Sequence, residues 1–197
     1  MDLISRISQH FTDSAQTKLD AIELLAAPIA GAVELMVGAL VGNGKILACG
    51  NGGSAADAQH FAAELVGRFE MERQGLAAIA LTTDSSIMTA VANDYGYATV
   101  FERQVRALGQ PGDVLLAIST SGNSPSVVEA VRSAQDNDLR VVALTGKGGG
   151  EIGRMLRDSD VHLCAPSDRT ARIQEIHLLT VHCLCDGIDC LLLGGEE

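Results

Sequence analysis

Four separated groups of residues in this sequence could do chemistry on a small phosphorylated ligand. A glycine-rich segment covers residues 50–54, and a serine-rich segment covers residues 119–124. Both offer backbone amides and hydroxyls that suit a phosphate. Outside them lie side chains that can exchange protons or bind a metal, namely His60, Glu64, Gln174 and His182. Together the four groups are typical of an enzyme site.

The serine-rich segment is the more specific of the two loops. It holds three serines and a threonine beside Gly122, directly before a predicted helix. The first amides of a helix have no intrahelical partner, and the helix dipole favours an anion there. We therefore expect a phosphate at this loop, with a capped loop that binds no ligand as the alternative. The spacing differs from Gly-x-x-x-x-Gly-Lys-Ser/Thr and gives nucleotide hydrolysis no support.

The glycine-rich segment is less specific by itself. Gly50 to Gly53 can bring bare backbone amides close to a ligand, and Ser54 is placed to cap the next helix. An ordinary strand-to-helix turn would explain the same residues. His60 and Glu64 follow on this helix, four residues apart, so both side chains share one face and could reach one ligand or metal. A surface pair is the alternative.

The elements that would position these groups alternate along the chain. Short, almost wholly apolar runs predict five buried strands, separated by helical patterns, as in a parallel sheet covered on both faces. The predicted strands are residues 45–49, 77–81, 114–118, 140–144 and 160–164. The predicted helices between them are residues 54–68, 85–93, 99–108, 124–136 and 151–157. Both small-residue segments then follow strand carboxyl ends, where ligands bind in open α/β sheets.

Helices at the two ends exceed what such a sheet needs. Two long helical segments are predicted before the first strand, within residues 1–42, and one closes the chain over residues 170–193. We assign residues 1–42 to oligomer contacts and residues 43–197 to the ligand-binding α/β core and C-terminal helix of a single domain. His177 and His182 lie among Leu, Val and Cys residues of the last helix, a setting typical of core histidines.

Composition excludes several classes of function. The 197 residues, 47% of them apolar, are enough for one core. A net charge of −11 opposes binding to nucleic acid or to an anionic membrane. Aromatic residues make up only 3% of the chain, with no Trp, so base-stacking platforms are scarce. A small ligand or a protein partner is expected instead.

The ends and the cysteines indicate a cytoplasmic protein. Residues 1–6 lack the basic region and apolar run of a secretory signal. The most apolar stretch, residues 24–41, is interrupted by Pro28 and Glu34, which favours a packed helix over a membrane span. The five cysteines are an odd number without Cys-x-x-Cys spacing, and we expect buried free thiols.

An ordered series of motifs resembles bacterial phosphoheptose isomerases, a family with the sugar-isomerase (SIS) fold. The motifs are residues 50–54 with Asp57, His60 and Glu64, then residues 92–94, 112–116, 119–124, 144–146 and 172–177. The resemblance runs from about residue 40 to the C-terminus. It implies an α/β fold with a five-stranded parallel SIS-type sheet flanked by helices.

The resemblance also implies an activity and a site. Family members convert sedoheptulose 7-phosphate to D-glycero-D-manno-heptose 7-phosphate, the entry to heptose for lipopolysaccharide core, as homotetramers with active sites at subunit interfaces and one zinc ion per subunit. By position, the implied zinc ligands are His60, Glu64, Gln174 and His182. The implied substrate-binding residues are Asn51, Gly52, Gly53, Ser54, Glu64, Asn93, Asp94, Ser119, Thr120, Ser121, Ser124 and Gln174.

The residue types suit an aldose–ketose isomerisation. A proton must leave carbon beside the carbonyl and return to the neighbouring carbon through an enediolate that needs charge stabilisation. We expect Glu64 to be the base at carbon and His182 the acid at oxygen. Zinc could polarise the carbonyl and hydroxyl while the serine-rich loop anchors the phosphate. A carboxylate held tightly by zinc is a weaker base, so Glu64 could instead be chiefly a ligand.

The spacing of Gln174 and His182 restricts the metal site. Eight residues on one straight helix correspond to about 12 Å of axial rise and roughly 80° of rotation. We therefore expect that the site draws on more than one subunit or that the helix is distorted. Ala171 stands where some family members have an acidic residue, with Asp168 nearby, so a supporting polar contact is missing or supplied differently.

A second resemblance gives the alternative function. Residues 11–14 and 183–186 are similar to the DnaA initiator-associating protein, a relative on the same fold that binds a replication initiator. That relative lacks a carboxylate at the position of Glu64 and has an altered serine loop, whereas this chain keeps Glu64, Ser121 and His182. The isomerase is favoured, with DnaA contact as the alternative. A SIS-type sensor would usually carry a basic DNA-binding segment, which this sequence lacks.

Overall fold

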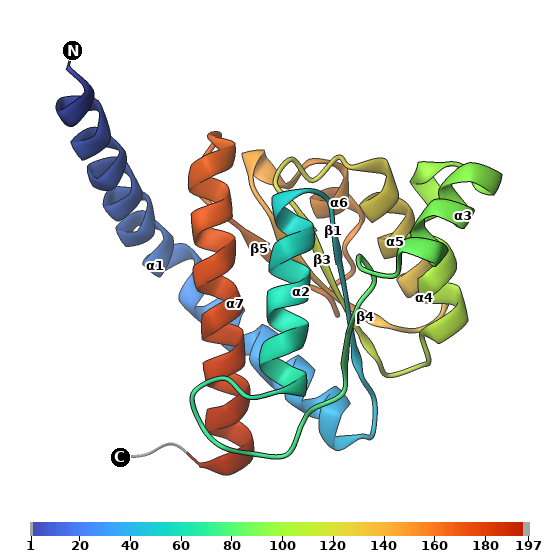
Figure 1. Ribbon diagram of the computed structural model, residues 1–197. Coiled ribbons are helices and arrows are strands. Elements are labelled where there is room, and N and C mark those ends of the chain that lie inside the picture. The colour runs from blue at the N-terminus through green and yellow to red at the C-terminus, as the bar shows by residue number, and fades with distance from the viewer. Residues whose placement is uncertain (1, 195–197) are drawn as a thin grey trace.

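The computed structural model describes residues 2–194 and contains a five-stranded parallel sheet in the order β2-β1-β3-β4-β5 (Figure 1). The strands are β1 (Ile46–Gly50), β2 (Ala78–Ala80), β3 (Val114–Ser119), β4 (Arg140–Thr145) and β5 (Val161–Cys164). Each overlaps a predicted strand, and β1 and β3 are buried at every position. The predicted fold class is confirmed.

Helices cover both faces of the sheet. One face carries α1 (Leu3–Val41), α2 (Gly53–Val66) and α7 (Thr170–Leu193). The other carries α3 (Ser85–Tyr95), α4 (Glu102–Leu108), α5 (Pro125–Asp136) and α6 (Gly150–Met155), with the short 3-10 helices η1 (Tyr97–Thr99) and η2 (Lys147–Gly149). The helix predicted over residues 99–108 is therefore divided between η1 and α4.

Alternation along the central strands separates the two halves of the core. In β3, Val114, Leu116 and Ile118 pack with α1, α2 and α7. Leu115 and Ala117 pack with the helices of the opposite face. Successive strand residues point to opposite sides of a sheet, and both sides here are covered, so the strand must be apolar throughout. This is why the strands were visible in the sequence as uninterrupted apolar runs.

The prediction of two N-terminal helical segments is wrong, because α1 is one helix of 39 residues. Pro28 lies inside it and removes one backbone donor, yet the flanking turns continue. No residue of α1 before Ala21 is buried, and the buried residues of this helix are Ala21, Leu25, Ala32, Val33 and Met36. The first half extends away from the sheet (Figure 1).

Two helices, α1 and α7, are long and apolar enough to cross a membrane by length and composition alone. They pack against each other beside the sheet, and Gly187 of α7 makes room for this contact. A Cβ at Gly187 would stand 2.7 Å from a methyl carbon of Val33. Part of the apolar surface of both helices is thus used inside the fold.

All five cysteines are free thiols, as predicted, but the expected burial is wrong for Cys183 and Cys190, which are exposed on α7. Cys49 lies in β1 and Cys185 in α7, and both are buried. Burial raises the pKa of each of these two thiols to about 12. Neither is a ready nucleophile at neutral pH.

His177 is a core residue that ties α7 to the sheet. Its Nε2 donates a hydrogen bond to the backbone oxygen of Thr145, at the end of β4, over 2.9 Å, and the residue is 1% exposed. Burial lowers the pKa of His177 from 6.5 to about 4, although the bond to Thr145 acts in the opposite direction. His177 is therefore neutral in the folded protein at neutral pH.

We predict that the free energy of unfolding decreases as pH falls from 6.5 to about 4. In this window the unfolded chain takes up a proton that the folded His177 excludes, which favours unfolding by on the order of 3 kcal/mol in total. Urea titrations of the wild type and His177→Gln across this range would measure the effect. The variant should show a weaker pH dependence, and equal dependence in both proteins would contradict the assignment.

Candidate active site

Both small-residue loops lie at the same edge of the sheet. β1 and β3 are neighbouring parallel strands, with Gly50 paired to Ile118. The glycine-rich loop therefore leaves β1 beside the point where the serine-rich loop leaves β3 (Figure 1). This carboxyl edge is the usual ligand site of open α/β sheets.

The imidazoles of α2 and α7 meet about halfway along the two helices. His60 Nε2 lies 3.0 Å from His182 Nε2, and 3.5 Å from Glu64 Oε1. The two imidazole nitrogens share one hydrogen bond, so one must carry a proton and the other must accept it. The Phe69 ring packs 5.7 Å from the His182 ring, measured between centroids. The structure thus brings together three of the four implied metal ligands within one chain.

This cluster is partly open to solvent and chemically versatile. The side chains of His60 and Glu64 are 40% and 22% exposed. Two imidazole nitrogens and a carboxylate oxygen can transfer protons or bind a borderline metal such as zinc. Among residues 2–194, nevertheless, no group of three or more His, Cys, Asp and Glu side chains is placed so that it could hold a metal ion.

Gln174 is placed apart from this cluster. A Cβ built on Gly53 would stand 2.4 Å from Gln174 Nε2, so the absence of a side chain at Gly53 lets the amide approach the glycine-rich loop. α7 is continuous from Thr170 to Leu193, so the prediction of a distorted helix is wrong. A site completed by a second subunit stays a prediction.

The glycine-rich loop departs from its predicted capping. α2 begins at Gly53, and Gly52 occupies the cap position with φ of 58° and no side chain to donate or accept. Ser54 lies in the first turn and is buried, so it does not cap the helix as predicted. The positive φ explains glycine at position 52.

Both polar atoms of the Asn51 side chain form hydrogen bonds. Its Nδ2 donates to Ser126 Oγ over 2.9 Å, and its Oδ1 accepts from the Tyr97 hydroxyl over 2.8 Å. These bonds link the glycine-rich loop to α5 and η1. Tyr97 and Ser126 were not predicted from the sequence, where their signal is weak, because Tyr97 is simply one of two tyrosines beyond the Asn93–Asp94 motif.

The serine-rich loop keeps its hydroxyls close together. Ser119 Oγ and Ser124 Oγ are 3.0 Å apart, and Ser121 Oγ accepts a hydrogen bond from the backbone N–H of Asn123 over 3.1 Å. Ser124 is the cap residue of α5, but its side chain makes no capping hydrogen bond. Thr120 lies between these serines and is half-buried. The loop can therefore offer hydroxyls to an anion at the start of α5.

Asn93 and Asp94 lie at the end of α3 and are exposed. Asn93 Nδ2 donates to Asp94 Oδ1 over 2.8 Å.

Asp57 lies on α2, one turn before His60. Burial raises the pKa of the Asp57 carboxyl, while the nearby His60 acts in the opposite direction. One oxygen of Asp57 is buried without a hydrogen-bond partner among residues 2–194.

Comparison with known proteins assigns this chain to a family. The SIS domain matches residues 10–146, and the chain belongs to the SIS domain family. Proteins named phosphoheptose isomerase from Azoarcus sp. (strain BH72) and Aromatoleum aromaticum (strain DSM 19018 / LMG 30748 / EbN1) are each 73% identical to it over 197 residues, covering 100% of both chains. Within the SIS proteins, the chain is therefore a member of the phosphoheptose isomerase family.

Solved structures agree with this assignment. Phosphoheptose isomerase GmhA from Neisseria gonorrhoeae is 56% identical, with a TM-score of 0.92 over 95% of this chain and 99% of that one. A phosphoheptose isomerase from Francisella tularensis is 47% identical, with a TM-score of 0.93 over 96% and 99% of the two chains. The resemblance inferred from the ordered motifs is confirmed.

We predict that Gly122→Ala disrupts the serine-rich loop. Gly122 has φ of 64°, and a Cβ there would stand 1.9 Å from the backbone oxygen of Gly149. Backbone cannot move aside as a flexible side chain can, so we expect a loss of more than about 2 kcal/mol in unfolding free energy. Urea titration would measure it.

Gly148→Ala is the matched control for this test. Gly148 also has a positive φ, 74°, but a Cβ there would meet nothing within 4 Å. Its expected loss is about 1 kcal/mol, from backbone strain alone. Equal losses in the two variants would show that the contact with Gly149 is unimportant.

Proposed function

We propose that the protein is a ketose–aldose isomerase that converts sedoheptulose 7-phosphate to D-glycero-D-manno-heptose 7-phosphate, the first step of heptose synthesis for lipopolysaccharide core. The observation that carries this proposal is the meeting of His60, Glu64 and His182 between α2 and α7. It occurs in a chain that matches proteins named phosphoheptose isomerase over its full length.

The chain's own side chains can perform the proton transfers. Glu64 removes a proton from C1 of the ketose, and His182 donates a proton to the C2 oxygen of the resulting enediolate, giving an enediol. Return of the carbon-bound proton to C2 and loss of the O1 proton complete the aldose, with no net change in protons. The short contact to His60 orients the His182 ring, because the two nitrogens share one proton.

The serine-rich loop anchors the opposite end of the substrate. Its hydroxyls and the first amides of α5 provide donors for the phosphate, with Ser119, Thr120, Ser121 and Ser124 as the binding side chains. Hydroxyl and amide donors suit a chain of net charge −11, in which Lys and Arg are outnumbered by Asp and Glu. Fixing the phosphate there restricts how the carbonyl end reaches Glu64.

We further propose one zinc ion per subunit, held by His60, Glu64 and His182, with Gln174 as the fourth ligand implied by the family resemblance. The donor chemistry supports zinc, because two imidazole nitrogens and a carboxylate oxygen lie close together. His182 Nε2 is 3.0 Å and Glu64 Oε1 is 3.5 Å from His60 Nε2. When bound, zinc would polarise the carbonyl and hydroxyl oxygens. Binding the ion would compete with the role of Glu64 as a base.

We expect Glu64→Gln to abolish turnover, with a loss of about 10³-fold or more, because the amide cannot accept the carbon-bound proton. Aldose formation from sedoheptulose 7-phosphate, followed by NMR, would measure it. The control is Glu72→Gln, since the Glu72 side chain is 90% exposed beside Arg68 and should leave turnover unchanged. Absence of turnover in the folded wild type supplied with zinc would refute the isomerase.

Metal removal tests the zinc proposal separately. We expect chelation to lower the rate and added zinc to restore it, and metal analysis should find less zinc in His60→Ala than in the wild type. The control is His10→Ala, a histidine on α1 remote from this cluster in sequence. Full activity of metal-free protein would contradict a role for zinc.

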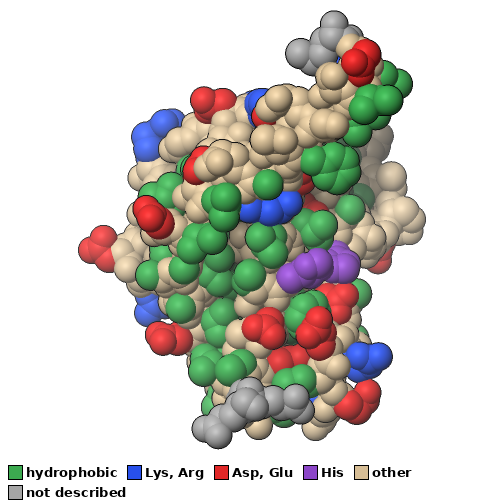
Figure 2. All heavy atoms as spheres, turned by 90° about the vertical axis from the view of Figure 1, so that its left-hand side faces the viewer, with side chains coloured by type: hydrophobic (Ala, Val, Ile, Leu, Met, Phe, Trp, Pro, Cys, Tyr) green, Lys and Arg blue, Asp and Glu red, His purple; other side chains and the backbone are tan. Residues whose placement is uncertain are grey.

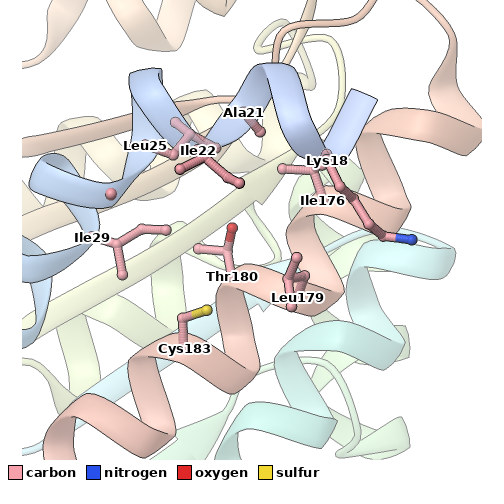
Figure 3. Close-up of a pocket in the computed structure, with 10 residues that line it drawn as sticks. Lys18, Ala21, Ile22, Leu25, Ile29, Ile176, Leu179, Thr180 and Cys183 are labelled. Carbon is pink, nitrogen blue, oxygen red and sulfur yellow. The ribbon is translucent and has the colours of Figure 1, made fainter. Parts of the chain in front are cut away.

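We propose a homotetramer in the cytoplasm with active sites at subunit interfaces. Apolar side chains gather on the face formed by α1 and α7, with acidic side chains around them (Figure 2). A groove on this face is lined by Ile22, Leu25 and Ile29 of α1 and by Ile176 and Leu179 of α7 (Figure 3). Its apolar lining favours contact with another copy of the chain over exposure to water.

We predict that Ile22→Asp dissociates the tetramer. Ile22 is 60% exposed in the single chain, and a buried unpaired carboxylate would be costly at an interface. Light scattering after gel filtration would report the mass. Leu108→Asp, at an apolar position 38% exposed at the end of α4, is the control and should stay tetrameric. A monomeric variant with full activity would exclude a site shared between subunits.

Contact with the DnaA replication initiator is the alternative function and is not favoured. Glu64, Ser121 and His182 are all present, and the relatives that match the whole chain carry the isomerase name. Direct binding of DnaA by a protein inactive on the sugar phosphate would reverse this preference.

A further inference from the structure

A buried arginine joins the two helices that carry the candidate catalytic residues. Arg73 lies in the loop between α2 and β2, and its side chain is 3% exposed. Its Nε lies 2.5 Å from Oδ1 of Asp189, on α7, whose side chain is also 3% exposed. The same guanidinium donates from Nη2 to the backbone oxygen of Glu64 over 2.9 Å, and from Nη1 to that of Leu65 over 2.8 Å.

These bonds place a cation at the end of α2. The helix ends at Val66, so the oxygens of Glu64 and Leu65 belong to the last turn, where carbonyls lack intrahelical partners. A positive charge is favourable at this end of the helix dipole. A planar guanidinium can bind two carbonyls and a carboxylate together, which the single ammonium of lysine cannot reproduce. The guanidinium of Arg73 thus holds the backbone of Glu64 itself.

The position of Asp189 makes this contact a constraint on the active site. Asp189 follows His182 by seven residues on α7, about two turns, so the two side chains share a face. On α2, His60 faces His182, and Glu64 and Leu65 face Asp189 through Arg73. The two helices are therefore joined at two levels, about 10 Å apart along α7. Sliding or rotating one helix would break both contacts.

Stability alone is a weak reason for this arrangement. Buried ion pairs can often be replaced by apolar residues of similar volume without loss of stability, because desolvation offsets their attraction. Here the second carboxylate oxygen of Asp189 is also buried, with no hydrogen-bond partner among residues 2–194. A pair that is costly to bury, and that contacts the Glu64 backbone, is better explained by the position it enforces.

We propose that Arg73 and Asp189 are positioning residues, which set the register of α2 against α7 so that His60 and Glu64 meet His182. Neither touches the reacting atoms in this account. The inference rests on the proposed isomerase function for its kinetic consequence, but its structural consequence can be measured independently.

The experiment compares two ways of altering the pair. The double variant Arg73→Met/Asp189→Leu removes both charges and should remain folded with a Tm near that of the wild type, yet lower kcat by about 10–100-fold with KM within about 3-fold. Asp189→Asn keeps an acceptor for Arg73, so it should keep kcat within about 3-fold while lowering Tm. A merely structural role predicts that kcat follows Tm in both proteins.

The control is a second ion pair with a buried carboxylate, far along the chain from the first. Lys45 Nζ lies 2.6 Å from Asp113 Oδ2, beside the starts of β1 and β3, at the sheet edge opposite the glycine-rich and serine-rich loops. The double variant Lys45→Met/Asp113→Leu should leave kcat of the folded protein unchanged. A loss of kcat equal to that of the Arg73/Asp189 variant would overturn the proposal.

Crystal structures provide the readout that does not depend on activity. In Arg73→Met/Asp189→Leu, the separation of His60 Nε2 and His182 Nε2 should exceed the wild-type value by 1 Å or more, as expected for a lost register. An unchanged separation with wild-type kcat would overturn the proposal. If the double variant fails to fold, Arg73→Lys replaces it, and wild-type kcat there would overturn the proposal equally. Absence of turnover in the wild type would refute the isomerase, while the separation would still decide the positioning role.

Discussion

The packing of α2 beside α7 is the constraint on which the candidate site depends. Neither helix carries a complete set of functional side chains, because His60 and Glu64 belong to α2 and His182 to α7. The imidazole nitrogens meet at 3.0 Å, a contact that small helix movements would abolish. The sheet supports α2 through its core contacts, and α1 supports α7 from the other side. The fold therefore supplies the precision that proton transfer requires.

The sheet adds the second half of the site. β1 and β3 end together, and their loops supply glycine amides on one side and serine hydroxyls on the other. The first loop needs bare backbone, since Gly53 lies against the Gln174 amide. In the second, Gly122 packs against Gly149. Close backbone contacts thus fix both loops relative to the helices, which separates a phosphate end from a proton-transfer end.

Much of this arrangement could be predicted from the sequence because its causes are local. Strands covered on both faces are apolar runs, and loops at their carboxyl ends are rich in Gly and Ser. Local patterns failed where tertiary contacts decide the outcome. Two N-terminal helical segments were predicted where α1 is a single helix, and Ser54 is buried instead of capping α2. The His60–His182 contact joins residues 122 positions apart, and the Arg73–Asp189 contact joins residues 116 apart, so spacing alone could not reveal either.

The most direct test of this account is a crystal structure of Glu64→Gln with sedoheptulose 7-phosphate bound. The account predicts the phosphate among the hydroxyls of Ser119, Ser121 and Ser124, and the C1–C2 end of the sugar beside residue 64 and His182. A phosphate bound elsewhere, or a carbonyl end remote from His182, would contradict the assignment of the site.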